Sequence, residues 1–227
     1  MRQKAIIISI KGFKLTNMEK TLLSKEKPWG IILFKRNIKS VYQTKKLISE
    51  IKKLTKNKKF PIIIDEEGKN VSRLKDIINH NFSSNFFGQL YKVDKKLCVK
   101  IFKHYINSLS NILKDLGINI NSIPVLDVLR INTNKVIGKR SFSKDEKIVK
   151  ILGNLTIKYL HSNKIAGIIK HIPGHGSSSK DSHKTMPKVL LGKKKLEKKD
   201  FFPFKSSKAK FAMTAHILYS KIDKKNV

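Results

Sequence analysis

The sequence predicts an α/β fold built around a parallel sheet, on three observations. Short apolar runs alternate along the chain with stretches in which apolar residues recur at helical spacing. The apolar runs are continuous, which is typical of strands buried on both faces of a parallel sheet. No internal repeat or linker interrupts the alternation, so residues 1–227 are expected to form a single domain.

Six strands are expected in chain order. Each is a run of mostly aliphatic or aromatic residues, and several end on a polar side chain. A closed barrel of eight strands would require two further strand–helix units and typically about 250 residues. The expected strands cover residues 5–10, 30–34, 60–64, 117–120 (continuing toward 126), 165–169 and 211–215.

Three helices are expected between these strands. Apolar residues follow a period of roughly 3.6 across residues 41–54, 97–116 and 145–159. Gly117 directly follows the second of these stretches, where a glycine commonly ends a helix. Cys98, the only cysteine, falls on the apolar stripe of the same helix and is expected to be buried. No disulfide can form within the chain.

The charge is strongly basic, with 50 Lys and Arg against 16 Asp and Glu and a formal net charge of +34. A nucleic-acid-binding protein usually gathers such charge on one face or in one tail. Here the lysines are spread over nearly every segment, and the aromatic residues fall mostly in core-like positions. A nucleic-acid partner is therefore disfavoured, although incidental adhesion to polyanions is expected.

The N-terminal apolar run is short and is interrupted by Lys11. It does not match the apolar region of a signal peptide. No stretch approaches the ~20 apolar residues of a membrane helix. We therefore expect a soluble, cytoplasmic protein without a membrane partner.

Polar side chains gather where the expected strands end. In parallel α/β folds the carboxyl ends of the strands form one edge of the sheet, and active sites lie at that edge. The residues in question are Asp65, Asp127, Lys170, His171 and His216.

The segment 170–183 is the richest in chemistry, because it combines three histidines and an aspartate with glycines and serines that favour a movable loop. Asp181 and His183 are two residues apart and could pair, which would make His183 a general acid/base. A metal site using these two residues with His171 and His175 is the alternative. Their spacing does not match a standard zinc signature, so the metal site is disfavoured.

Further candidate binding residues follow the third and fourth strands. Asp65 begins an Asp-Glu-Glu-Gly segment, and ionised carboxylates can accept several hydrogen bonds from sugar hydroxyls. Arg73 lies a few residues later, and Arg140 lies in the loop after the fourth strand. Either arginine could instead belong to a surface ion pair of little value.

Together these segments resemble the β-N-acetylglucosaminidases of glycoside hydrolase family 3, of the NagZ type. The family reads Lys-His-Phe-Pro-Gly-His-Gly where this chain has Lys-His-Ile-Pro-Gly-His-Gly, and both continue to Asp-Ser-His. The family's Asp-Gln-Glu-Gly-Gly is matched by Asp-Glu-Glu-Gly. The motifs occur in the family's order at residues 30–37, 65–68, 124–127, 137–142, 170–176, 181–183 and 213–216.

The resemblance implies a (β/α)8 TIM-barrel fold, of which about six of eight units lie in this sequence. It implies removal of terminal N-acetylglucosamine, with retention, from peptidoglycan fragments or chitobiose-like substrates, without a cofactor. By position, His183 would be the acid/base and Asp181 would orient it. The sugar would be held by Asp65, Arg73, Arg140, Lys170 and His171.

Three departures from the family accompany the resemblance. Lys69 stands where the family has a second glycine, and residues 177–180 differ from the family's loop. The family's nucleophile is an aspartate after the seventh strand, and the sequence ends at Val227, just past the sixth. The expectation is therefore a C-terminally truncated β-N-acetylhexosaminidase that is inactive alone without the nucleophile segment. The alternatives are a sugar-binding protein without catalysis, or one half of an enzyme completed by a partner chain that supplies the remaining strands.

Overall fold

The computed structural model describes residues 3–180, 186–205 and 207–225. Six parallel strands form one sheet in the order β1-β2-β3-β4-β5-β6, so each strand pairs with its neighbour in sequence. This confirms the α/β fold expected from the sequence. The strands are β1 (Lys4–Ser9), β2 (Pro28–Leu33), β3 (Ile62–Ile64), β4 (Ile120–Asn121), β5 (Ala166–Ile172) and β6 (Phe211–Thr214).

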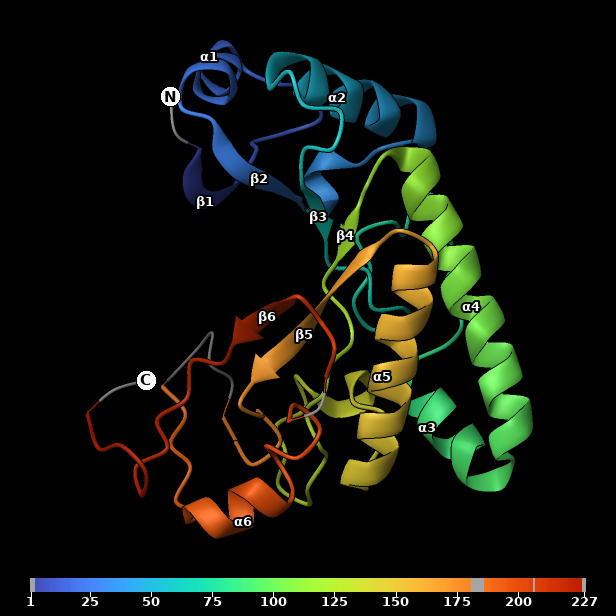
Figure 1. The fold of residues 1–227 in the computed structure, drawn as a ribbon, viewed down its shortest axis with the longest axis vertical. Helices are drawn as coiled ribbons and strands as arrows, with labels where there is room; N and C mark the ends of the chain where they lie inside the picture. Colours follow the sequence, from blue (N-terminus) through green and yellow to red (C-terminus); the bar gives the residue numbers. More distant parts are fainter. Residues whose placement is uncertain (1–2, 181–185, 206, 226–227) are drawn as a thin grey trace.

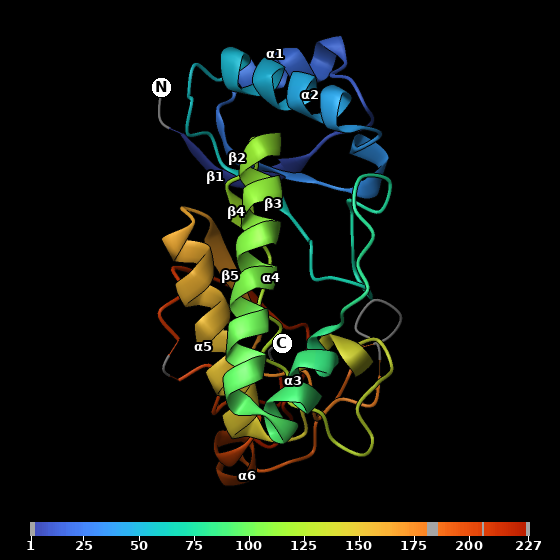
Figure 2. The ribbon, with the colours of Figure 1, turned by 90° about the vertical axis from the view of Figure 1, so that its right-hand side faces the viewer.

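Helices follow the strands and cover the outer side of the curled sheet (Figures 1 and 2). The three expected helices are present as α2, α4 and α5, and Asp145 caps the last of them. Three further α-helices, α1, α3 and α6, were not expected. The helices are α1 (Asn17–Lys25), α2 (Val41–Leu54), α3 (Ser84–Val93), α4 (Lys95–Leu116), α5 (Glu146–Ser162) and α6 (Lys193–Lys198), with 3-10 turns η1 (Lys35–Asn37) and η2 (Gly138–Arg140).

The sheet curls into part of a barrel. Trp29 on β2 and Phe211 on β6 meet edge to face, with ring centroids 5.4 Å apart, although three strands separate them in the sheet. Ile63, Ile120 and Ile168 form a buried cluster beside these two rings. The curl therefore encloses an apolar interior on the concave side, as in a (β/α) barrel.

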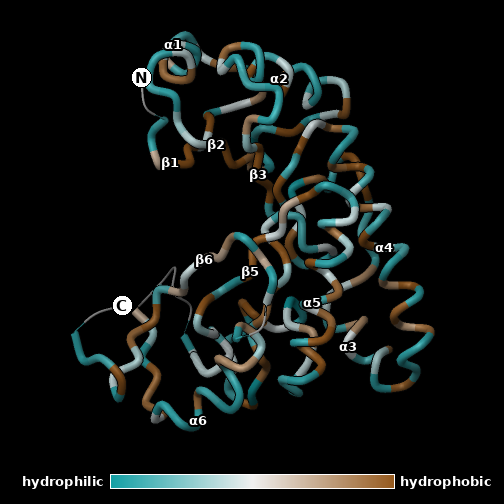
Figure 3. Tube along the Cα trace, viewed as in Figure 1, coloured by the Kyte–Doolittle hydropathy of each residue, from teal (hydrophilic) through white to brown (hydrophobic). Residues whose placement is uncertain are grey.

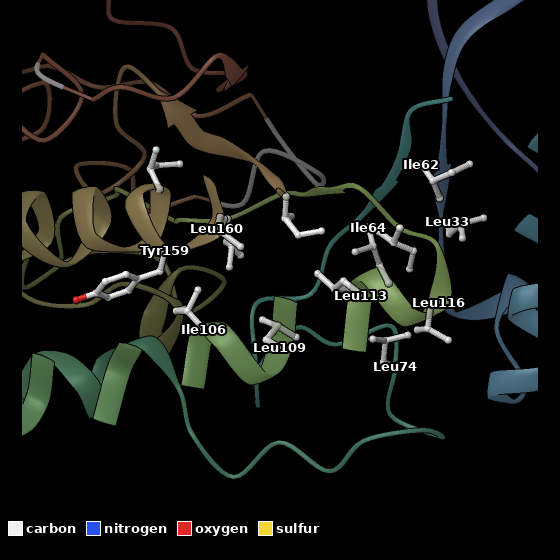
Figure 4. Packing of buried hydrophobic residues seen from close by; sticks show 14 of the residues in the cluster. Leu33, Ile62, Ile64, Leu74, Ile106, Leu109, Leu113, Leu116, Tyr159 and Leu160 are labelled. Atoms are coloured by element: carbon white, nitrogen blue, oxygen red, sulfur yellow. The ribbon is translucent and has the colours of Figure 1, made fainter. Parts of the chain in front are cut away.

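The larger core lies between the sheet and the helices (Figure 4). Side chains alternate across a strand, so Ile62 and Ile64 join this outer core while Ile63 joins the inner cluster. Leu113 on α4 packs in the same outer core. Figure 3 shows the corresponding alternation of hydrophobic and hydrophilic residues along α2 and α4.

The first strand differs from its expected burial. It was expected to be covered on both faces, but Ile6 and Ile7 are 51% and 46% exposed. In the described part of the chain, β1 has only β2 as a neighbour and lies at the edge of the sheet. Continuous hydrophobicity indicated a strand but did not reveal its position in the sheet.

The fourth strand is shorter and later than expected. Gly117 is not part of it but adopts a left-handed conformation (φ 89°) that ends α4, as its position after the helix predicted. Pairing resumes beyond Pro124, where Val125 bridges to Lys170 and the Leu126 amide donates to the Lys170 carbonyl at 2.7 Å. Proline has no amide proton, so it cannot continue the hydrogen-bonded ladder.

Cys98 is fully buried on α4, as expected, and burial raises the pKa of its thiol to about 11. In the part of the chain that the structure describes, no helix combines the length and apolarity needed to cross a bilayer.

Candidate functional site

Three neighbouring strands deliver charged residues to one edge of the sheet. Asp65 directly follows β3, Asp127 lies in the segment after β4, and Lys170 and His171 occupy the end of β5. The contacts among these residues connect positions up to 105 apart in sequence. The strand-end cluster that the sequence predicted therefore forms, because parallel strands place their carboxyl ends together.

Lys170 is the centre of this cluster. Its ammonium lies 3.1 Å from Asp65 Oδ1, 2.6 Å from Glu67 Oε1 and 3.0 Å from Ser122 Oγ. Only 2% of the residue is exposed. A buried ammonium is stable only when it is paired and hydrogen-bonded, and here three oxygens satisfy its three donors.

Arg140 reaches the same cluster from η2. Its Nε and Nη2 donate to the two oxygens of Glu67 at 2.7 and 2.8 Å, a bidentate pair. Burial alone would raise the pKa of Glu67, but Lys170 and Arg140 outweigh it and hold that pKa below the ordinary value. Glu67 is thus an ionised link between two of the predicted binding residues.

Arg73 makes a weaker contact, with Nη2 3.4 Å from Asp65 Oδ2, and its guanidinium lies over the Phe34 ring at 5.8 Å. Its Nε is buried and has no hydrogen-bond partner among the described residues. Burial opposes ionisation of Asp65, yet Lys170, with smaller contributions from Ser122 and Arg73, holds the pKa of Asp65 below its ordinary value.

Glu66 was not singled out from the sequence, but it organises the Arg73 segment. It is fully buried and accepts from the backbone amides of Arg73 and Leu74 at 2.8 and 2.9 Å. Its Oε1 lies 2.8 Å from His80 Nε2. The sequence held a signal for this role, because Glu66 and Glu67 directly follow a buried strand. Consecutive side chains in an extended segment point in opposite directions, so only one of the two glutamates can face the site.

Asp127 forms a second group of contacts in the site, with His171 and His175. Its side chain is fully buried; Oδ2 lies 2.7 Å from His171 Nδ1, and Oδ1 accepts from the backbone amides of His171 and His175 at 3.3 and 2.6 Å. Burial would raise the pKa of Asp127, but His171 and the hydrogen bond from His175 keep it below its ordinary value. The carboxylate therefore stays ionised beside His171.

The first part of the Gly/Ser loop is firmly anchored. Gly174 and Gly176 pass so close to other backbone that a Cβ on Gly176 would lie 1.8 Å from the Val128 carbonyl oxygen. The Tyr219 hydroxyl donates to the Gly174 carbonyl, and the Thr133 hydroxyl donates to the Gly176 carbonyl, both at 2.6 Å. Glycine is required here for close approach rather than for motion.

The two predicted catalytic residues, Asp181 and His183, lie outside the described residues. His216, another strand-end candidate, follows β6 and is exposed. Among the described residues, no group of three His, Cys, Asp or Glu side chains is arranged to hold a metal ion.

Lys69, which replaces the family's second glycine, is exposed and donates its backbone amide to Phe82. The preceding Gly68 (φ 117°) is the tight position, because a Cβ there would lie 2.8 Å from the Phe82 carbonyl oxygen. The glycine that this chain retains is therefore the one that the backbone needs.

One large cavity lies away from the strand-end charges. It has a volume of about 580 Å³ and lies between the C-terminal ends of α2 and α4, and its walls include Lys45, Lys52 and Gly117. None of the strand-end charges lines it. The charged cluster at the strand ends is the candidate site, since it joins buried ionised groups from several strands.

The chemistry of the cluster suits a ligand rich in hydroxyl groups. The Asp65 carboxylate can accept, and the guanidinium groups of Arg73 and Arg140 can donate, because these side chains keep some exposure. Lys170, Glu67 and Asp127 are buried and already paired, so they hold the exposed groups in place. Charged groups that are already held in position in a partly buried site also need little rearrangement to bind a complementary ligand.

Comparison with known proteins places these features in a family. The model of the glycosyl hydrolase family 3 N-terminal domain matches residues 2–227. A β-hexosaminidase from Neisseria meningitidis is 33% identical over 224 residues, covering 97% of this chain and 62% of that protein. β-Hexosaminidase A from Pseudoalteromonas piscicida is 32% identical, covering 91% of this chain and 36% of that protein.

A solved structure shares the fold closely. The crystal structure of NagZ from Neisseria gonorrhoeae in complex with N-trifluoroacetyl-D-glucosamine superimposes with a TM-score of 0.91 at 31% identity, covering 99% of this chain and 66% of that one. The chain thus spans about one to two thirds of the length of these curated relatives. The match over the whole chain and the shared fold show that this chain belongs to glycosyl hydrolase family 3 and carries its N-terminal domain.

Proposed function

We propose that this protein acts as a β-N-acetylhexosaminidase that removes terminal N-acetylglucosamine, with retention, from peptidoglycan fragments in the cytoplasm. The observation that carries the proposal is the buried Lys170 cluster, in which Asp65, Glu67 and Arg140 converge at the ends of the strands. Further support comes from the β-hexosaminidase relatives and from the glucosamine derivative named in the NagZ structure.

In this proposal Asp65, Arg73, Arg140, Lys170 and His171 bind the sugar. The Asp65 carboxylate accepts hydrogen bonds from sugar hydroxyls, and the arginine donors complement the remaining oxygens. Lys170, whose three donors are engaged in the unliganded protein, would bind the sugar by exchanging one of those contacts. Because the ion pairs already fix these side chains, little conformational entropy is lost on binding.

Catalysis is assigned to His183, with Asp181 as the residue that orients it. A carboxylate beside an imidazole fixes its tautomer and supports its protonated form, which a general acid needs. The loop begins at a fixed point, because Tyr219 and Thr133 hold the carbonyls of Gly174 and Gly176. In this proposal His183 reaches the bound sugar from the residues beyond that point.

Retaining hydrolysis also requires a nucleophile, about 5 Å from the acid/base in enzymes that use two carboxylates. We propose that it comes from further strands, carried by the same polypeptide or by a partner chain, that pair with β1 and β6. The exposed Ile6 and Ile7 support this, because an apolar edge strand normally has a neighbour or a cover.

The test uses the protein purified from its native source, with its intact mass measured first. We expect hydrolysis of a fluorogenic N-acetylglucosaminide, with the β-anomer of N-acetylglucosamine as the first product detected by NMR. Asp65→Asn is expected to lower the activity at least tenfold, because it removes a charged acceptor for the sugar and one of the two ion pairs of Lys170. Asp115→Asn, which alters an exposed ion pair with Lys45, serves as the matched control.

The same experiment separates the two candidate functions. Binding of N-acetylglucosamine without hydrolysis would reject the enzyme and favour a sugar-binding protein. Hydrolysis only after addition of a second polypeptide would favour an enzyme divided between two chains. Failure to bind the sugar in every preparation would reject both.

A further inference from the structure

We propose that Asp127 is a positioning residue that holds the His171 imidazole as the tautomer protonated on Nδ1, so that His171 presents Nε2 to the bound sugar. The role of Nε2 rests on the proposed function, in which His171 contacts the sugar. The tautomer itself is a property of the unliganded protein and can be measured without any sugar.

The orientation of the Asp127 carboxylate is fixed from one side. Oδ1 accepts two backbone amides, from His175 at 2.6 Å and from His171 at 3.3 Å. The other oxygen, Oδ2, then faces the His171 ring at 2.7 Å from Nδ1. These two backbone hydrogen bonds fix the orientation of the Asp127 carboxylate independently of the His171 ring.

This arrangement determines which ring nitrogen carries the proton. An ionised carboxylate can only accept, so a contact of 2.7 Å requires a proton on Nδ1. In neutral imidazole the second nitrogen, Nε2, is then a bare acceptor, and in the protonated ring both nitrogens donate. The carboxylate of a Ser-His-Asp triad fixes its histidine in the same way.

Nε2 of His171 differs from the cationic side chains of the site in being able to accept a hydrogen bond. Lys170, Arg140 and Arg73 can only donate hydrogen bonds, whereas a neutral His171 in this tautomer accepts one. The His171 side chain is 17% exposed, and its Nδ1 is already engaged. Nε2 is thus suited to accept from a hydroxyl, which selects a ligand that donates at this point.

His175 lies close but contributes differently. Its ring centroid is 6.0 Å from that of His171, and burial lowers the pKa of its side chain. Its Nδ1 is buried without a hydrogen-bond partner among the described residues. The hydrogen bond that His175 gives to Asp127 comes from its backbone amide.

Asp127→Asn tests the assignment with almost no change of shape. The amide oxygen can still accept the two backbone amides, which leaves the NH2 group facing His171. Because NH2 donates, Nδ1 must become the acceptor, and the proton is expected to move to Nε2. A role limited to holding the backbone would leave the tautomer unchanged.

The measurement is a long-range ¹H–¹⁵N spectrum of the histidine-labelled protein, recorded at a pH where titration shows the ring to be neutral. His171 signals are identified by their loss in His171→Gln. We expect Nδ1 to be the protonated nitrogen in the wild type and Nε2 in Asp127→Asn. We also expect the variant to bind N-acetylglucosamine about tenfold more weakly, as for loss of one hydrogen bond.

Asp200→Asn is the matched control, because Asp200 is also fully buried but contacts Arg130 and Ser177 instead of a histidine. It should leave the His171 nitrogen signals unchanged. A wild-type ring protonated on Nε2 would overturn the proposal even if Asp127→Asn fails to fold. An unchanged tautomer in a folded Asp127→Asn would overturn it as well.

Measuring the affinity for N-acetylglucosamine alongside the nitrogen spectra distinguishes a failure of this inference from a failure of the proposed function. A reversed tautomer with unchanged sugar affinity would show that Nε2 does not contact the sugar and would overturn that half of the proposal. Absence of sugar binding by the wild type would contradict the proposed function, while the nitrogen signals would still decide whether Asp127 fixes the tautomer.

Discussion

At the scale of single residues, the site is a set of buried charges that stabilise one another. Removing an ion from water costs several kcal/mol, and the cost is offset only by good pairing and hydrogen bonds. Glu67 meets that condition through Lys170 on one side and Arg140 on the other. The whole cluster is therefore sensitive to the loss of any one charge.

Glu67→Gln should destabilise the protein by about 3 kcal/mol, because it leaves two buried cations with less negative charge beside them. Denaturant unfolding followed by circular dichroism measures the change. Glu50→Gln, which breaks the exposed pair with Lys20, should cost at most about 1 kcal/mol. Equal effects of the two substitutions would contradict the view that burial makes the Glu67 pairs important.

Acid should unfold the protein through its buried carboxylates. Asp65, Glu67 and Asp127 have pKa values held below the ordinary 3.8 to 4.5. The unfolded chain therefore takes up protons first as the pH falls, and the folded state loses stability below about pH 5. His175 adds to this loss from its ordinary pKa of 6.5 downward, because its folded pKa is also lowered.

The free energy of unfolding between pH 7 and pH 3 measures this dependence. It should fall continuously with falling pH, and the slope should be shallower in Asp127→Asn, which cannot titrate at that position. A free energy that stays flat down to pH 3 would be inconsistent with the lowered pKa values.

The sequence predicted which residues lie at the strand ends, but it did not predict which side chains contact one another there. Asp65, Lys170 and His171 could be assigned to the strand ends, because polar residues that stop an apolar run lie there. The pairing of His171 with Asp127 joins positions 44 apart. Contacts of that kind depend on the register between neighbouring strands, and hydrophobic periodicity carries no information about that register.

At the scale of elements, the long amphipathic helices were predictable and the short ones were missed. α2 and α4 have many periodic apolar positions, so the pattern is clear. α1 has a single buried residue, Leu23, and its signal was instead the capping box of Thr16 and Glu19. Local capping, rather than periodicity, marks a helix of this length.

The position of α3 depends on a close contact at Gly88. A Cβ there would lie 1.7 Å from the Phe142 carbonyl oxygen, in the segment that follows Arg140. Gly88→Ala should therefore displace α3 and destabilise the protein by about 2 kcal/mol despite the better helix propensity of alanine. Thermal unfolding measures the loss.

Gly12→Ala is the control for this substitution, because nothing lies within 4 Å of a Cβ at Gly12. It should leave the melting temperature nearly unchanged. A Gly88→Ala protein as stable as the wild type would mean that α3 can shift without consequence for the core.

At the scale of the whole molecule, the curl of the sheet brings distant strands together. Trp29 and Phe211 come from the second and sixth strands and meet across the concave side. The helices cover only the outer side, which leaves the inner apolar cluster to the strands themselves (Figure 1). This curvature gathers the strand ends into one site.

The formal charge of +34 is also a property of the whole molecule. We expect weak DNA binding at low salt that is independent of sequence and falls steeply as salt rises, because it depends on release of counterions. Fluorescence anisotropy with a labelled duplex at 50 and 200 mM salt measures the fall. Affinity that persists at the higher salt would indicate a true nucleic-acid site and revive that function.

The sequence by itself determined the class of fold, the succession of strands along the chain, the long helices and the residues that end the strands. These features follow from local patterns of hydrophobic and polar residues. Tertiary structure alone decided that β1 pairs only with β2 among the described residues, that Pro124 interrupts the fourth strand's pairing, and that Asp127 faces His171. These depend on which strands become neighbours, and that choice is made by packing across the sheet rather than by any one segment.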